Sequence, residues 1–130
     1  MDNIEFESVL NGVLNKCTET LGVKAGEYAT EDRLHNFKIA AKLQNCSPIT
    51  ALAGMMCKHT VSVYDLIQKH EKGEEISQEM WDEKIGDSIN YLILLSALVK
   101  EDKKNNNSIR EYDCYYDLIS TERMIDNEQE

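Results

Sequence analysis

The sequence predicts an all-α protein that folds as an antiparallel bundle of four to five helices. Only one Pro and six Gly occur in 130 residues, which argues against the turn-rich chain of a β-sandwich or barrel. Apolar residues recur every three or four positions over several long stretches, as they do in amphipathic helices. Hydrophobic residues make up 42% of the chain and charged residues 29%, which suits one packed core with a solvated surface.

The first predicted helix covers residues 4–21, where apolar side chains form a stripe along one face. Gly22 is expected to end it, and residues 23–29 to form a short connector. A second helix is predicted from Thr30, as its cap, to about residue 44. Acidic residues 31–32 would then lie in its first turn, where carboxylates interact favourably with the helix dipole.

The third and fourth predicted helices have clear starting signals. Ser47-Pro48 combines a residue typical of the N-cap with a proline suited to the first helical position. This third helix should reach about residue 70, before Lys72-Gly73. Ser77 can cap a fourth helix that runs to about Val99.

A polar tract over residues 101–108 is interpreted as a linker. It would separate a bundle domain, residues 1–100, from a C-terminal helix and tail, residues 109–130. Ser108 and Glu111 fit the capping box, in which the two side chains satisfy free backbone N–H groups at the start of a helix.

Composition excludes several function classes. A net charge of −10 disfavours binding to nucleic acids or to anionic membranes. The first ten residues lack the pattern of a signal peptide, and the longest apolar stretch, residues 91–99, is too short to span a bilayer. The four cysteines lack C-x-x-C spacing, which indicates reduced thiols rather than zinc ligands or disulfides. We therefore expect a cytoplasmic protein without a membrane or nucleic-acid partner.

The fourth predicted helix carries polar residues inside an otherwise apolar stretch. Glu83, Asp87 and Asn90 stand at i, i+4 and i+7 and so share one helix face. A carboxylate near a core is costly unless it is paired, hydrogen-bonded or bound to a cation. These residues are therefore a solvated stripe, a tie to a neighbouring helix or ligands of a metal ion.

Two further polar groups have both structural and functional interpretations. Lys58-His59 lies between apolar segments, so His59 is either a hydrogen-bonded core residue or a ligand contact, and Lys58 either pairs with an acid or contacts a phosphate. Residues 27–38 concentrate carboxylates, cations, an imidazole and an amide. They form either a capped, solvated helix end or a site where carboxylates hold Mg²⁺ or Mn²⁺ and Arg33 or Lys38 contacts phosphate.

Four short segments resemble a group of phage and bacterial proteins, the nucleotide-modification-associated domains. These are related to the all-α nucleotide pyrophosphohydrolases of the MazG and dimeric dUTPase type, and the resemblance covers roughly residues 20–100. The segments are Lys24 to Tyr28, Asp32 to Phe37, Lys58-His59 and Asp87 to Tyr91.

This resemblance implies a metal-dependent hydrolase in which two acidic pairs hold Mg²⁺. Glu27 and Glu31 resemble the first pair and Glu83 and Asp87 the second, with Glu27 or Glu31 as general base. The family pattern is E-x-x-E followed by E-x-x-D, whereas both pairs here are four residues apart. Lys84 also stands where the family has Glu.

The sequence thus predicts a metal-dependent nucleotide pyrophosphohydrolase that acts on a (deoxy)nucleoside triphosphate. Two alternatives stay open, a non-catalytic protein that binds or sequesters a nucleotide and a helical interaction module. A homo-oligomer is expected because the fourth helix is apolar on more than one face. The predicted substrate-binding residues are Tyr28, Arg33, His35, Asn36, Lys38, Lys58, His59, Asn90 and Tyr91.

Overall fold

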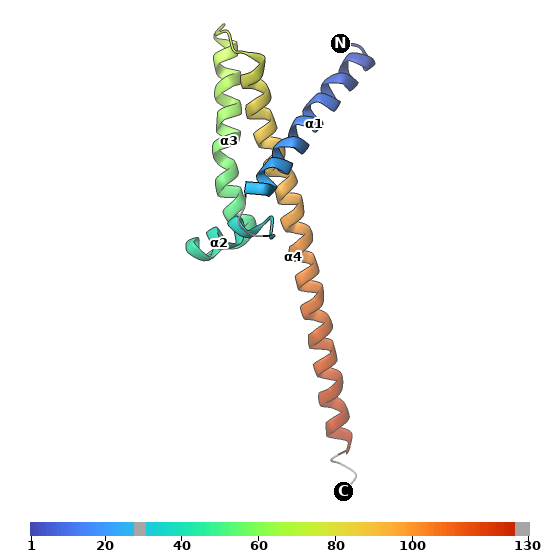
Figure 1. Cartoon of the computed structure of the whole chain (residues 1–130). Helices are drawn as coiled ribbons and strands as arrows, with labels where there is room; N and C mark the ends of the chain where they lie inside the picture. The colour runs from blue at the N-terminus through green and yellow to red at the C-terminus, as the bar shows by residue number, and fades with distance from the viewer. Residues whose placement is uncertain (28–30, 127–130) are drawn as a thin grey trace. The chain divides into compact units, whose positions relative to one another are not determined.

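The computed structural model describes the backbone of residues 1–27 and 31–126 and the side chains of residues 1–23 and 31–106. Within these ranges the chain forms four α-helices and no strand, which confirms the all-α prediction (Figure 1). The helices are α1 (Asn3–Glu27), α2 (His35–Gln44), α3 (Pro48–Glu71) and α4 (Gln78–Asp126). The chain divides into two compact units, one up to Ser96 and one from Ala97 onward. None of the described helices is long and apolar enough to cross a membrane.

Helix α3 begins and ends where the sequence predicts. The Ser47 hydroxyl accepts a hydrogen bond from the Thr50 amide at 3.1 Å, and Pro48 is the first helical residue. At the other end Gly73 adopts φ of +81°, in the left-handed region that glycine enters without steric cost. Its amide donates to the carbonyl of His70 at 2.9 Å and so satisfies one of the last free carbonyls of the helix.

The start of α4 is also confirmed, because the Ser77 hydroxyl accepts a hydrogen bond from the Met80 amide at 3.2 Å. The predicted linker over residues 101–108 is wrong as to its secondary structure, since α4 continues through it without a break. The tract contains neither Pro nor Gly, and its lysines and glutamate are good helix formers. Asn106 also donates to Asp102 one turn earlier, at 3.1 Å.

The boundary predicted between the first two helices is wrong. Helix α1 continues past Gly22 to Glu27, because a glycine in a helix costs only about 1 kcal/mol and does not by itself end it. Helix α2 begins at His35 rather than just after Thr30, which lies outside the described residues. Asp32 precedes the helix, and its Oδ1 accepts a hydrogen bond from the Leu34 amide at 2.9 Å. This Asx turn competes with helical conformation at that position.

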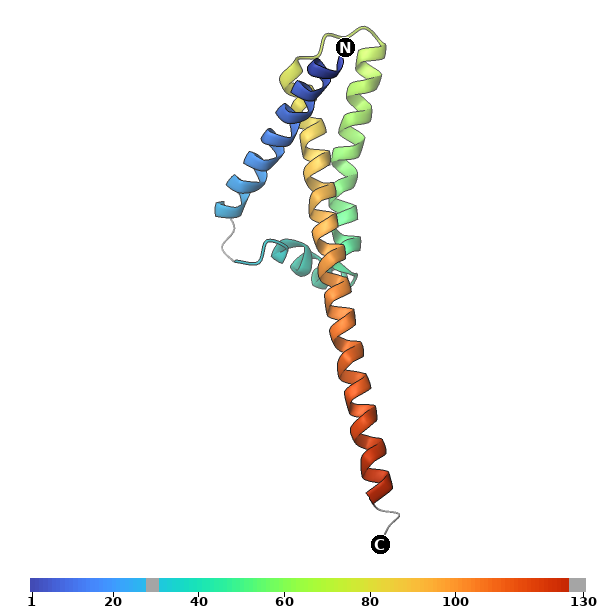
Figure 2. The same cartoon turned by 90° about the vertical axis from the view of Figure 1, so that its right-hand side faces the viewer.

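Within the first unit, α3 and α4 run antiparallel, side by side (Figures 1 and 2). The ring of His70 contacts that of Trp81 near the connection between the two helices, and His59 contacts Tyr91 further along. Helix α1 runs in the same direction as α4, since Lys16 pairs with Asp82 at 3.4 Å and the following Cys17 contacts the carbonyl of Gly86.

Helix α2 packs against α3 and completes the core of the first unit. The apolar residues buried in this unit are Cys17, Leu34, Phe37, Ala41, Ala51, Leu52 and Leu66. Most of them lie on α2 or in the half of α3 next to it. Three of the cysteines, Cys17, Cys46 and Cys57, are free thiols, and the side chain of Cys114 lies outside the described range. Burial raises the pKa of the Cys17 thiol.

Candidate functional site

A cavity of about 390 Å³ lies in the first unit, between the C-terminal part of α1, the start of α2, the middle of α3 and the neighbouring stretch of α4. Its volume falls in the range of small-molecule sites in proteins. The residues that line it are Thr20, Leu21, Arg33, Asn36, Phe37, Lys58, His59, Asp87, Asn90, Tyr91 and Leu94.

The cavity brings together residues that the sequence predicts from separate segments. They are Arg33, Asn36, Lys58, His59, Asp87, Asn90 and Tyr91. Sequence reasoning missed four other lining residues, Thr20, Leu21, Phe37 and Leu94. Leu21 and Leu94 are apolar and lie at helical spacing among core residues, so nothing in their pattern separates a cavity wall from ordinary packing. Phe37 could have been predicted as a lining residue, because it directly follows His35 and Asn36 in the sequence.

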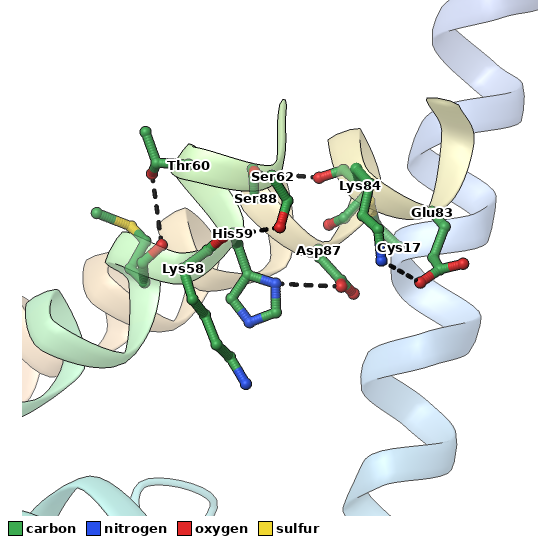
Figure 3. A network of polar contacts seen from close by, with 11 residues as sticks. Cys17, Lys58, His59, Thr60, Ser62, Glu83, Lys84, Asp87 and Ser88 are labelled. Carbon is green, nitrogen blue, oxygen red and sulfur yellow. Dashed lines mark hydrogen bonds and ion pairs between the residues drawn. The ribbon is translucent and has the colours of Figure 1, made fainter. Parts of the chain in front are cut away.

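His59 and Asp87 connect α3 to α4 at the edge of the cavity. Nδ1 of His59 lies 3.2 Å from Oδ2 of Asp87, and the His59 side chain is only 16% exposed (Figure 3). A carboxylate at this distance favours a proton on Nδ1, which leaves Nε2 as the ring nitrogen available to another group. Asp87 is thus tied to a neighbouring helix, one of the structural interpretations that its position in the sequence allows.

Three aromatic rings meet on one wall of the cavity. The rings of His59 and Tyr91 lie with their centroids 4.6 Å apart and their planes tilted by 33°. Phe37 approaches Tyr91 edge-on, at 6.3 Å and 72°. Such pairs are favourable in themselves and present flat apolar surface to a planar molecule.

Two cations line the same cavity. Arg33 donates from Nη2 to the carbonyl of Leu21 at 2.7 Å, which ties the segment before α2 to α1. A guanidinium carries five N–H donors, so this bond uses only a part of its capacity. Lys58 is exposed and has no ion-pair partner among the described side chains. Figure 3 shows Lys58 and His59 extending to the same side of α3.

Asn90 is the one polar side chain that is buried within the described part of the chain, with 7% of its surface exposed. Its Oδ1 accepts no hydrogen bond there. Leaving a buried acceptor without a donor costs about 1–3 kcal/mol. Asn90 therefore places an unpaired hydrogen-bond acceptor in the lining of the cavity.

The other predicted residues lie elsewhere. Glu83 is 58% exposed and pairs with Lys84 at 2.6 Å, and this hydrogen bond lowers the pKa of Glu83 and raises that of Lys84. Lys38 pairs with Asp32 at 2.8 Å, and its hydrogen bond lowers the pKa of the Asp32 carboxyl. Neither Glu83 nor Lys38 lines the cavity.

Glu31 is exposed and lies outside the cavity lining, and His35 lines a second pocket along α2 that shares Asn36, Phe37 and Tyr91 with the cavity. The side chains of Glu27 and Tyr28 lie outside the described range. Among the described residues, no three His, Cys, Asp or Glu side chains come together in a group that could hold a metal ion. The predicted site of four carboxylates, with its Mg²⁺ or Mn²⁺, stays a prediction.

Comparison of the chain with protein-family models, with curated proteins and with solved structures found no match. The resemblance to the pyrophosphohydrolases accordingly stays a prediction as well. The chemistry of the cavity rests on its own residues: two cations, an imidazole that faces a carboxylate, an aromatic wall and two amides.

Proposed function

We propose that the cavity binds a nucleotide. The observation that carries this proposal is the convergence of Lys58 and Arg33, the His59–Tyr91 ring pair and the buried amide of Asn90 in one space of about 390 Å³. A nucleotide joins an anionic phosphate to a planar aromatic base that carries hydrogen-bonding groups. The lining supplies a partner for each of these parts.

The phosphate is held by the cations. Lys58 contributes an exposed ammonium that pairs with no carboxylate among the described side chains, and Arg33 contributes N–H donors from a guanidinium already fixed by its bond to Leu21. Charge-assisted hydrogen bonds to phosphate are about twice as strong as neutral ones. This local positive charge offsets the repulsion that a net charge of −10 exerts on an anion.

The base stacks on the aromatic wall. Stacking of a base on an aromatic side chain contributes on the order of 1–3 kcal/mol and tolerates any base. Asp87 acts here as a positioning residue, because it faces Nδ1 of His59 and so holds the imidazole against Tyr91. In this role Asp87 stabilises the wall instead of coordinating a metal ion.

Binding, rather than hydrolysis, is the function that the geometry supports best. Of the described acidic residues, only Asp87 lines the cavity, and Glu83 is occupied by Lys84. A metal-dependent hydrolysis of a nucleoside triphosphate, the activity implied by the sequence resemblance, would need Glu27 and Glu31 to complete the site. It stays a prediction that the same experiment tests.

The experiment is a thermal-shift screen of nucleoside mono-, di- and triphosphates and cyclic dinucleotides, each with Mg²⁺ and with EDTA. A ligand at 100 times its Kd stabilises a protein by about 2.7 kcal/mol, which raises the Tm of a domain of this size by roughly 10 °C. Chromatography of each stabilising mixture then separates the two activities. Intact ligand and stabilisation in EDTA support binding alone, whereas release of monophosphate and pyrophosphate establishes the hydrolase. The absence of any stabilisation contradicts nucleotide binding.

A second copy of the chain covers the apolar surface that the first unit leaves exposed. The N-terminal part of α1 exposes large apolar residues, and most of the stability of a helix in a protein comes from packing of its apolar face. More such residues lie on α3 and α4, and patches of this kind mark interaction surfaces. Sedimentation that finds only a species of about 15 kDa at micromolar concentration contradicts this homo-oligomer. The exposed residues include Ile4, Phe6, Val9, Leu10, Leu14, Val61, Tyr64, Met80 and Leu92.

A further inference from the structure

Asn90 presents an unfinished hydrogen-bonding arrangement inside the cavity. Its side chain is buried, its Oδ1 has no donor among the described groups, and the residue lines the space between α2, α3 and α4. Most buried side-chain oxygens in proteins accept at least one hydrogen bond, so an oxygen to which no described group donates needs an explanation.

The neighbouring side chains do not provide that partner. The guanidinium of Arg33 bonds to the carbonyl of Leu21, and the Lys58 ammonium is exposed to solvent. The terminal torsion of an asparagine has a broad energy profile, so turning the amide edge toward the cavity requires only rotation about that torsion. A molecule in the cavity is then the nearest source of a donor for Oδ1.

We infer that Asn90 pairs with the Hoogsteen edge of adenine and so makes the cavity selective for this base, an inference that rests on the proposed nucleotide binding. An asparagine amide offers an acceptor and a donor side by side. Adenine offers the complementary edge, with its 6-amino donor next to the N7 acceptor. The same edge of guanine carries two acceptors, that of cytosine a donor alone, and that of thymine an acceptor alone. On this Hoogsteen edge only adenine satisfies both atoms of the amide, whereas on the Watson–Crick edge every base offers a donor beside an acceptor, so the comparison with GMP, CMP and UMP tests which edge is used.

The test compares AMP with purine riboside 5′-monophosphate, which lacks the 6-amino group. Both ligands carry the same phosphate and a purine ring, so the contributions of Lys58 and the aromatic wall cancel in the ratio of affinities. We expect AMP to bind roughly 10- to 100-fold more tightly, because the analogue leaves Oδ1 without its donor. Titration calorimetry in EDTA measures both constants with the wild-type protein.

The variant Asn90→Leu separates recognition from a structural role. Leucine removes the unpartnered acceptor, so the free protein should keep or raise its Tm while it binds AMP no better than the analogue. A purely structural Asn90 would instead lose stability on substitution and leave the preference unchanged. Asn106→Leu, on the same helix but outside the cavity, is the matched control and should keep the full preference for AMP.

The outcomes distinguish the two proposals. Equal affinity of the wild-type protein for AMP and its analogue overturns the role of Asn90 in selecting adenine, while nucleotide binding stands. Preferential binding of GMP, CMP or UMP overturns it in the same way. If none of these monophosphates binds, and no larger nucleotide does, the proposed function itself fails. The wild-type comparison decides the matter even if Asn90→Leu does not fold.

Discussion

Within the first unit, both ends of the α3–α4 pair contain a contact between a histidine and an aromatic ring, but the residues around the two contacts differ. Near the connection, His70 meets Trp81 edge-on at 6.0 Å, and every residue from Ile67 to Glu75 is exposed. Near α2, the ring centroids of His59 and Tyr91 lie 4.6 Å apart beside a carboxylate and a buried amide, and the same half of α3 carries Leu52, whose exposure is 0%. The same pairing of imidazole and aromatic ring is therefore part of a cavity at one end only.

The comparison indicates that the candidate site depends on α2. Helix α2 packs against the first half of α3 and contributes Phe37 to the aromatic wall, and the segment before it contributes Arg33. Near the connection, Leu66 is the one buried apolar side chain of α3, and a smaller cavity of about 220 Å³ lies between α1 and the first turns of α4 without contact to α2. Substitutions that distinguish the two ends test this role of α2.

Core truncation should separate the two ends most strongly. Leu52→Ala removes a side chain with 0% exposure and should lower the free energy of unfolding by about 2–5 kcal/mol. Ile67→Ala, at the other end and 42% exposed, should cost at most about 1 kcal/mol. Urea denaturation of both variants measures the difference. Equal losses would contradict the assignment of the core to the α2 end.

Removal of a phosphate-binding cation should weaken the ligand but not the fold. Lys58→Gln is expected to reduce nucleotide affinity on the order of tenfold, and the effect should shrink at high salt, because the contribution is electrostatic. Lys69→Gln, an exposed lysine on the same helix outside the cavity, should leave affinity unchanged. Titration calorimetry of both variants at two salt concentrations compares them. An equal loss in the two variants would indicate a general charge effect.

Asp87→Asn should have an intermediate effect on both stability and binding. The amide is close in size to the carboxylate but loses the charge that faces Nδ1 of His59, so we expect a loss of about 1 kcal/mol of stability and weaker binding in EDTA. Asp65→Asn, on the exposed surface of α3, is the control. If Asp87→Asn weakens binding only when Mg²⁺ is present, the carboxylate acts on a metal ion and not on His59.

The smallest effect concerns pH and the carboxyl group before α2. The hydrogen bond from Lys38 lowers the pKa of the Asp32 carboxyl below its ordinary value of 3.8. The ionised carboxyl therefore adds to the stability of the folded chain fully at pH values above 3.8. This contribution is lost as the pH falls through the lowered pKa. Because the pair is partly exposed, Asp32→Asn should cost about 0.5 kcal/mol at pH 7 and nothing at strongly acidic pH. Thermal unfolding across this range measures the difference.

The fold was predictable where local chemistry decides it. Ser47-Pro48 and Gly73 fix the ends of α3 through caps that depend on a few neighbouring residues, and both predictions are confirmed. The boundary at Gly22 was not predictable, because a glycine lowers helix stability without ending the helix unless it enters the left-handed region. The polar tract of residues 101–108 misled the prediction for a related reason, since polarity alone does not prevent a helix.

Part of the lining of the cavity could be predicted from the sequence, but the pairing of its side chains could not. Spacing selected Lys58, His59, Asp87 and Asn90 as polar residues in apolar helices, and the cavity contains all four. Spacing also placed Glu83 on the same face as Asp87, yet Glu83 pairs with its neighbour Lys84 and does not line the cavity. The partner of each side chain depends on which helices pack together, and a single sequence carries little information on that.

The central claim is that a nucleotide binds at the α2 end of the α3–α4 pair. The most direct test is a ¹H–¹⁵N correlation spectrum of the labelled protein, titrated with AMP in EDTA. We expect saturable chemical-shift changes for the amides that line the cavity and unchanged amide shifts around His70 and Trp81. The lining residues to follow are Asn36, Lys58, His59, Asn90 and Tyr91. Shifts that are absent, or that centre on the connection between α3 and α4, would contradict it.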